Sequence, residues 1–291
     1  MGSILDDEFV IQMDELPPFS WIRQTPNRFM NCVLGRKIDH LVVKAKGNAQ
    51  IFAIMAQEVL GEDKIQVETF SSPSLGGENC IISYSGQLKA ALTALEATGG
   101  KGIVMSSGGM VKTLARKKGW DYIPLPKGYS TPFLFPEIFG CLLSIFGKRV
   151  NFQDIEKFIE INCPSEMTEA NEAKRLAVLL KKERLKVLYD EKSTGLAAMF
   201  TNLFLTYSGM DLVKENIVNI SSNKNGIKEV ADVISFSSKS EFNRKKLIGN
   251  FPYDCDSLDG YLRNVIIAQF ASLYLGILES REIELLDREV E

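Results

Sequence analysis

Short apolar runs alternate with longer segments of helical periodicity along most of the chain. Between residues 38 and 125 the short runs are apolar on both faces, as buried parallel strands are. The predicted strands are 38–45, 64–70, 79–84, 102–107 and 121–125, and the predicted helices between them are 49–61, 87–99 and 110–119. This alternation predicts a doubly wound parallel sheet flanked by helices.

A second cycle of the same kind follows residue 165. Its predicted helices are 171–183, 195–209, 239–249 and 256–280, and its predicted strands are 185–190, 216–221 and 231–236. Asp256 or Ser257 is expected to cap the last helix, because either side chain can accept a hydrogen bond from the first N–H groups. The pattern therefore predicts an α/β protein with two related domains, residues 1–150 and 151–291.

Composition excludes several classes of partner. The 291 residues are 45% apolar and carry a formal net charge of -3, with acidic and basic residues interspersed. Because no basic face is left for a phosphate backbone, nucleic acid is not an expected partner. The N-terminus is acidic where a signal peptide is basic, and the apolar stretch from Phe133 is too short to cross a bilayer. We therefore expect a cytoplasmic protein with no membrane partner.

The sequence also gives little support for a metal site or for nucleophilic catalysis. The five cysteines form no C-x-x-C pair, and the single histidine, His40, directly precedes an apolar run. We expect the thiols to be buried and reduced, and His40 to open a strand instead of acting in catalysis. Zinc sites in proteins use several Cys or His ligands, so no metal and no other cofactor is expected.

Two turns rich in serine and glycine carry the candidate chemistry. Each lies between a predicted strand and the next helix, where parallel sheets bind ligands and helix N-termini favour anions. Small hydroxyls there can donate to a phosphate without crowding it. The residues concerned are Ser83, Ser85, Gly86, Gln87, Ser106 and Ser107. The alternative is that these residues only shape the turns, since serine and glycine are common in such loops.

At the same turns the chain resembles a known family. SYSG after one strand, SSGG after the next and DYIPLPKGYSTP after that are similar to the sugar isomerase (SIS) fold, specifically to phosphoglucose/phosphomannose isomerases. NEAKRLA from Asn171 and ASLYLGIL from Ala271 resemble later motifs of that family. The matching motifs occur in the same order as in that family, between residues 35 and 285. It implies two SIS domains, each a doubly wound, flavodoxin-like parallel sheet, a homodimer, and aldose–ketose isomerisation of hexose 6-phosphates.

Several positions depart from the motifs of that family. Its first glycine-rich turn corresponds here to KAKGNA, so the resemblance implies phosphate contacts at Lys46, Gly47 and Asn48. A threonine of its second turn is replaced by Leu88, and an arginine that follows a proline is replaced by Phe133.

The catalytic positions differ as well. The family's glutamate aligns near Thr206 and its histidine near Lys224, so neither the carboxylate nor the imidazole is retained. Lys224 is a candidate substitute acid or base, although loop lysines are ordinarily exposed. Glu137, in the helix after the lost arginine, is either a residue that points into the cleft or an ordinary helix residue, and the second is expected.

Two functions therefore stay open. Isomerisation needs a base for the proton beside the carbonyl and an acid or cation for the enediolate. One possibility is a diverged phosphosugar isomerase that uses substitutes such as Lys224. The other is a noncatalytic, phosphosugar-binding regulatory protein. The retained turns favour an anionic ligand in both cases.

Overall fold

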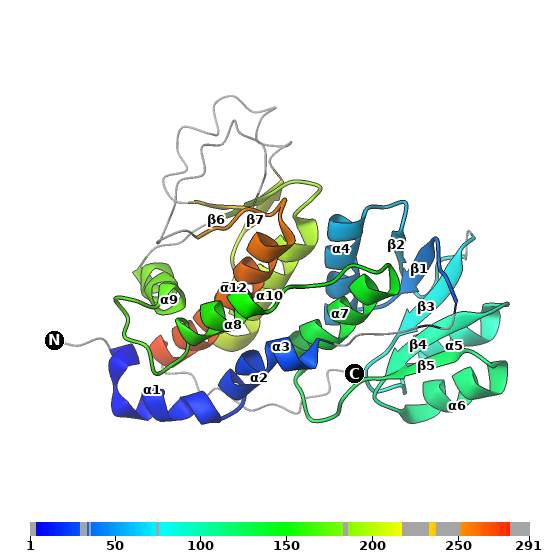
Figure 1. The fold of residues 1–291 in the computed structure, drawn as a ribbon, viewed down its shortest axis with the longest axis horizontal. Helices are drawn as coiled ribbons and strands as arrows, with labels where there is room; N and C mark the ends of the chain where they lie inside the picture. The colour runs from blue at the N-terminus through cyan, green and yellow to red at the C-terminus, as the bar shows by residue number, and fades with distance from the viewer. Residues whose placement is uncertain are drawn as a thin grey trace. The chain divides into compact units, whose positions relative to one another are not determined.

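The computed structural model describes residues 4–29, 34, 36–73, 76–182, 186–216, 233–236 and 251–279. The chain forms two compact units (Figure 1). We call Asn27–Arg149 the first-sheet unit, and Met1–Pro26 with Val150–Leu285 the second-sheet unit. The domain boundary at residue 150 stays a prediction, and the structure groups residues 4–26 with the second sheet.

The first-sheet unit contains a five-stranded parallel sheet in the order β2-β1-β3-β4-β5. Its strands are β1 (Leu41–Lys44), β2 (Ile65–Glu68), β3 (Glu78–Ile82), β4 (Gly102–Ser106) and β5 (Asp121–Pro124). Its longer helices are α4 (Asn48–Leu60), α5 (Lys89–Ala97), α6 (Gly109–Lys118) and α7 (Phe135–Ile145). This strand order is the flavodoxin-like one. The predicted parallel sheet is therefore confirmed.

Helices cover both faces of this sheet (Figure 1). On one face, α5 and α6 pack on β3 and β4 through a buried cluster that includes Ile81, Val104, Leu95 and Val111. On the other face, α4 packs against α7. The apolar spacing of α5 and α6 thus points their inner faces at the sheet, and both helices begin at its carboxyl edge.

The second-sheet unit has three described strands in the order β7-β6-β8, also parallel. They are β6 (Lys186–Tyr189), β7 (Lys214–Asn216) and β8 (Val233–Ser235). The longer helices are α8 (Gln153–Glu160), α9 (Glu172–Lys182), α10 (Thr194–Ser208) and α12 (Leu258–Leu278). β7 begins before the predicted strand 216–221, and the predicted helix 239–249 lies outside the described residues.

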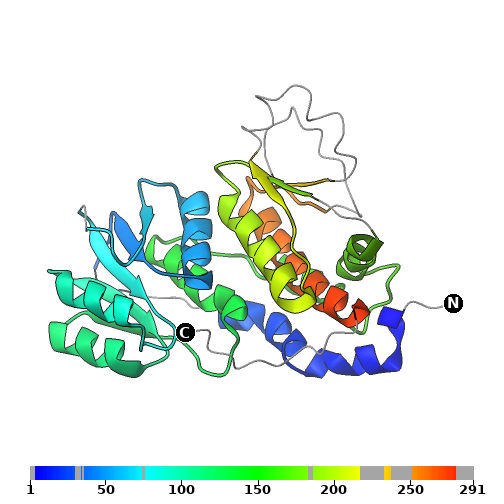
Figure 2. The same cartoon turned by 180° about the vertical axis from the view of Figure 1, so that it is seen from behind.

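Helix α12 is the centre of this unit and lies beside α10 (Figure 2). It begins at the predicted cap, since Ser257 Oγ accepts a hydrogen bond from Gly260 N at 3.1 Å. Of the described helices, α12 alone is long and apolar enough to cross a membrane, with a mean hydropathy of 1.3. However, 83% of that apolar window is buried inside the protein, as in the core helix of a globular unit.

The N-terminal segment belongs to this unit because it packs on α12. The segment contains η1 (Ile4–Asp6), α1 (Glu8–Gln12), η2 (Met13–Glu15) and α2 (Phe19–Arg23), and the boundary between the two units falls within the next helix, α3 (Thr25–Arg28). The ring of Phe19 is fully buried and lies 5.3 Å from the ring of Tyr274 and 6.2 Å from that of Phe270. Such aromatic contacts bury a large apolar area and hold the segment in place.

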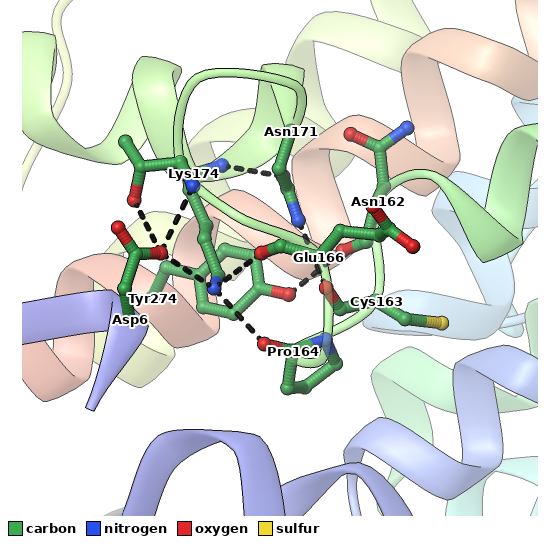
Figure 3. Close-up of polar contacts among 9 residues, drawn as sticks. Asp6, Asn162, Cys163, Pro164, Glu166, Asn171, Lys174 and Tyr274 are labelled. Atoms are coloured by element: carbon green, nitrogen blue, oxygen red, sulfur yellow. Dashed lines mark hydrogen bonds and ion pairs between the residues drawn. The ribbon is translucent and has the colours of Figure 1, made fainter. Parts of the chain in front are cut away.

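A buried ion pair holds the same segment (Figure 3). Lys174 is fully buried, and its Nζ lies 3.1 Å from Asp6 Oδ1. Nζ also donates to the carbonyls of Pro164 at 2.9 Å and Glu166 at 2.6 Å. Burial lowers the pKa of Lys174, although Asp6 opposes this. Burial alone would raise the pKa of Asp6, but hydrogen bonds from Thr168 and Lys174 outweigh it and lower that pKa.

The cysteines are mostly buried, as expected. Cys80, Cys141 and Cys163 are reduced and buried, Cys255 is partly exposed, and Cys32 lies outside the described residues. Burial raises the pKa of the Cys163 thiol to about 12. Within the described ranges, no group of three His, Cys, Asp or Glu side chains could hold a metal ion.

Candidate functional site

The candidate site is the carboxyl edge of the first sheet, where β1, β3 and β4 are neighbours. Each of these strands leads into a helix, namely α4, α5 and α6. The N-cap residues are Gly47, Leu88 and Gly108, whose side chains cannot accept a hydrogen bond. The first N–H groups of an α-helix have no partner within the helix and carry a partial positive charge. Three such helix starts at adjacent strands offer donors to an anion.

The turns after β3 and β4 approach so closely that two positions require glycine. Gly86 has φ 67°, and a Cβ there would collide with the carbonyl oxygen of Gly108. Gly109 has φ 69°, and its Cβ would lie 2.6 Å from the carbonyl oxygen of Ser85. Val111 N donates to Gly86 O at 3.0 Å and joins the two turns. The glycines of SYSG and SSGG therefore let the two turns share one backbone surface.

The serines of the turn after β4 are used within the loops. Ser106 is fully buried, and its Oγ donates to Gly108 O at 2.8 Å and accepts from Gly108 N at 3.2 Å. Ser107 Oγ donates to Tyr84 O at 2.8 Å. Because both hydroxyl protons are engaged in these bonds, this turn would reach an anion through its backbone.

The turn after β3 presents one hydroxyl more openly. Ser83 is buried, and its backbone N donates to Met105 O at 3.0 Å. Ser85 is half-buried, and its Oγ accepts from the backbone N of Gln87 at 3.3 Å. Among the contacts of the described residues, Ser85 Oγ acts only as an acceptor, so its O–H is left for a ligand. The side chain of Gln87 is exposed.

The turn after β1 supplies a third set of groups. Gly47 has φ 63° and precedes α4, whose first residue is Asn48. Asn48 Nδ2 donates to Thr131 Oγ1 at 2.9 Å, so its amide is fixed by the segment that precedes α7. Lys46 is exposed and could approach an anion from the solvent side. Phe133, the residue in place of the family's arginine, is buried.

A buried pair of charges lies behind this turn. Lys44 Nζ is 3.7 Å from Glu68 Oε2, and both side chains are more than nine-tenths buried. Lys44 Nζ donates to Ser72 O at 2.5 Å, whereas Glu68 Oε2 accepts no hydrogen bond from the residues that the structure describes. Sequence reasoning missed this pair. The sequence feature that could have indicated the pair is that Lys44 ends β1 and Glu68 ends β2, two adjacent strands in which these residues are paired in register.

The remaining candidates lie elsewhere. His40 opens β1 at the amino edge of the sheet, as expected, and its Nδ1 lies 3.1 Å from Asp63 O. Thr206 is exposed near the end of α10 in the second-sheet unit. Lys224 lies outside the described residues. Glu137 is buried and is bound by Arg28, so it is not the ordinary helix residue that the sequence suggested.

Part of the sequence matches a known protein. No family model matches the chain. A segment of 89 residues is 36% identical to a D-glucosamine-6-phosphate 4-epimerase from Sulfolobus acidocaldarius. The match covers 28% of this chain and 29% of that protein, so it spans less than a third of the relative's length.

Solved structures match nearly the whole chain. A glucose-6-phosphate isomerase like protein from Thermus thermophilus covers 96% of this chain and 94% of its own, with TM-score 0.57 and 14% identity. Glucosamine-6-phosphate deaminase from Thermotoga maritima covers 98% of both chains, with TM-score 0.59 and 11% identity. The C-terminal domain of glucosamine-fructose-6-phosphate aminotransferase from Francisella tularensis covers 94% and 96%, with TM-score 0.55 and 13% identity. The chain thus has the fold of SIS-type phosphosugar proteins, as the motifs predicted.

Proposed function

We propose that this chain binds a hexose 6-phosphate or a 2-amino-hexose 6-phosphate, with the phosphate at the carboxyl edge of the first sheet. The observation that carries the proposal is that α4, α5 and α6, which follow three neighbouring strands, all begin without a side-chain cap. A phosphate dianion would accept hydrogen bonds from these helix starts and from Ser85 Oγ. The names of the similar proteins, which describe hexose and amino-hexose 6-phosphates, support this ligand class.

The chemistry proposed for the bound sugar is aldose–ketose isomerisation, the reaction that the resemblance implies. The three turns, residues 44–48, 83–88 and 106–110, contain lysine but no aspartate, glutamate or histidine. A base for the proton beside the carbonyl must then come from outside these turns. Lys224 is the proposed candidate, and Thr206 could only donate or accept a hydrogen bond.

A second function, phosphosugar binding without turnover in a regulatory role, is favoured by the same composition. Hydroxyls, amides and helix starts suffice to bind a phosphate, whereas isomerisation needs proton transfer as well. In either case a homodimer in the cytoplasm remains a prediction, and light scattering of the purified protein would test the dimer.

Ligand binding is tested by thermal shift and calorimetry with glucose, fructose and glucosamine 6-phosphates, and with inorganic phosphate as a probe of the phosphate site alone. A ligand at a hundred times its Kd stabilises the folded state by about 2.7 kcal/mol, so the melting temperature should rise clearly. Ser85→Ala should weaken binding about tenfold, because a hydrogen bond to a charged group is lost. Thr93→Ala, which removes an exposed hydroxyl from α5, is the control. No shift with any of these phosphates would refute the proposal.

Turnover is tested separately by incubating fructose 6-phosphate in D2O. Isomerisation through an enediolate removes a proton from the carbon beside the carbonyl and returns one that exchanges with solvent. Deuterium at C2 of an aldose product, with loss of the signal in Lys224→Met, would support the isomerase. Binding without deuterium incorporation would support the regulatory alternative.

A further inference from the structure

We infer that Arg28 is a positioning residue for the candidate site, because its ion pair with Glu137 fixes the segment that holds Asn48 at the start of α4. The inference rests on the proposed function, since it concerns how firmly the turn after β1 is presented to a ligand. All the residues involved belong to the first-sheet unit.

The ion pair is buried and bidentate. Arg28 Nε donates to Glu137 Oε1 at 2.7 Å, and Nη2 donates to Glu137 Oε2 at 2.9 Å. The two side chains are 8% and 3% exposed. Burial raises the pKa of Glu137, and the hydrogen bonds and charge of Arg28 oppose this only in part. A planar guanidinium matches both carboxylate oxygens at once, which fixes the geometry of the pair.

Arg28 also contacts both ends of the segment that precedes α7. Its Nη2 donates to the carbonyl oxygen of Phe133 at 2.5 Å. Its guanidinium carbon lies 3.8 Å from the centre of the Tyr129 ring, in cation–π contact. Between these two contacts, Phe133 N donates to Ser130 O at 2.9 Å and closes a tight turn. One side chain thus holds residues 129 to 133 from the side of α3.

This segment reaches the candidate site through Thr131. Thr131 Oγ1 accepts the hydrogen bond from Asn48 Nδ2 at 2.9 Å. Asn48 directly follows Gly47, whose carbonyl accepts hydrogen bonds from the backbone N of Gln50 and of Ile51 at 3.1 Å. A continuous set of contacts therefore runs from Arg28 through Thr131 to the first turn of α4. If Arg28 is shortened, Thr131 loses its fixed position and so does this helix start.

Lysine cannot replace Arg28 in this role. A lysine ammonium is a single charged centre on a flexible side chain. It therefore cannot bind both carboxylate oxygens of Glu137 and at the same time donate to Phe133 O and stack on the ring of Tyr129. Arg28→Lys therefore keeps the charge that Glu137 needs, and with it the fold, but loosens the segment. The Arg28→Lys variant therefore distinguishes a role of Arg28 in positioning the segment from a need for its positive charge alone.

The binding experiment uses Arg28→Lys, Thr131→Val and the double variant, titrated with the hexose 6-phosphate that binds the wild type best. Each single change should weaken binding about tenfold, and the double variant should bind no more weakly than the worse single one, because both act through one set of contacts. Arg116→Lys, at an exposed position on α6, is the matched control and should bind as the wild type does. Independent, additive losses or unchanged affinity would overturn the inference.

A second measurement needs no ligand and separates this inference from the proposed function. Amide hydrogen exchange at Gln50 and Ile51 should quicken at least fivefold in Arg28→Lys and in Thr131→Val, while Val111 in α6 should exchange as in the wild type. If the wild type binds no phosphosugar but exchange quickens there, the proposed function fails and the positioning role of Arg28 stands. If exchange at these two amides is unchanged in both variants, the positioning role fails.

Discussion

Side-chain caps occur at two of the four longer described helices of the second-sheet unit, whereas α8 and α10 lack them, and at none of those of the first-sheet unit. In the second-sheet unit, Asn171 Oδ1 accepts from Lys174 N at 2.8 Å at the start of α9, and Ser257 Oγ caps α12. In the first-sheet unit, α4, α5 and α6 follow glycine or leucine and have no side-chain cap. A side-chain cap contributes about 1 kcal/mol per helix. The first-sheet unit forgoes this stabilisation at three adjacent helices, where no side-chain cap competes with an anion for the first N–H groups.

The turns that follow β1 and β6, the first strand of each sheet in chain order, also differ. After β6, Asp190 Oδ1 accepts from Lys192 N at 3.0 Å and from Ser193 Oγ at 3.1 Å, so a carboxylate of the chain itself satisfies the turn. After β1, the corresponding place is held by Gly47, which has no side chain. A side chain therefore satisfies part of the turn after β6, although α10 itself begins without a side-chain cap, whereas Gly47 brings no side chain to the start of α4.

The largest predicted effect lies in the second-sheet unit. Lys174→Met should lower the free energy of unfolding by about 3–5 kcal/mol, because it leaves the carboxylate of Asp6 buried without its cation. Urea unfolding followed by circular dichroism measures this loss. Adding Asp6→Asn to Lys174→Met should recover part of it, since the uncompensated charge is then gone. A loss below about 1 kcal/mol would mean that this ion pair does not hold the N-terminal segment.

The second-largest predicted effect is a loss of stability in the first-sheet unit. Gly86→Ala should cost about 2 kcal/mol, because alanine is strained at φ 67° and its Cβ would collide with the backbone of Gly108. The same change should also weaken phosphate binding by separating the two turns. Gly147→Ala is the matched control, since Gly147 has φ 71° and no atom lies within 4 Å of its added Cβ.

Fluorescence of Trp120 measures the stability of the unit that contains Gly86. The chain has two tryptophans, so Trp21→Phe leaves Trp120 as the reporter of the first-sheet unit. Urea unfolding in this background isolates the effect of Gly86→Ala. Equal stability of the Gly86→Ala and Gly147→Ala variants would show that the two turns do not need their close approach.

Sequence patterns predicted the sheet well because its strands are buried on both faces and its helices are amphipathic. The place of residues 4–26 could not be predicted, since the partners of Phe19 and Asp6 lie more than 150 residues further along the chain. Lys174, for example, lies 168 positions after Asp6. Lys44 was missed for a related reason. A lysine at the end of an apolar run is usually exposed, and only the pairing of β1 with β2 places Glu68 beside it.

The motif matches also had two different physical origins. SYSG and SSGG lie at the candidate site, where glycine permits the close approach of two turns. NEAKRLA and ASLYLGIL instead supply Lys174 and Tyr274, which bind backbone carbonyls of the loop from Asn162 to Glu166. The second pair of motifs therefore reports a packing requirement. A sequence pattern alone cannot separate the two origins, because both require particular residues at particular positions.

The smallest predicted effect tests the missing caps directly. Leu88 precedes α5 with φ -60° and ψ 116°, a backbone conformation that an N-cap residue adopts. Leu88→Asn and Leu88→Asp lose the same apolar contacts and add a similar cap, but only aspartate adds a negative charge. A charge at a helix start is worth about 0.3–1 kcal/mol, so phosphate should bind about two- to fivefold more weakly to Leu88→Asp than to Leu88→Asn. Calorimetry at low salt measures the ratio, and raising the salt concentration should shrink it. Equal affinities for the two variants would mean that the start of α5 does not face the bound anion.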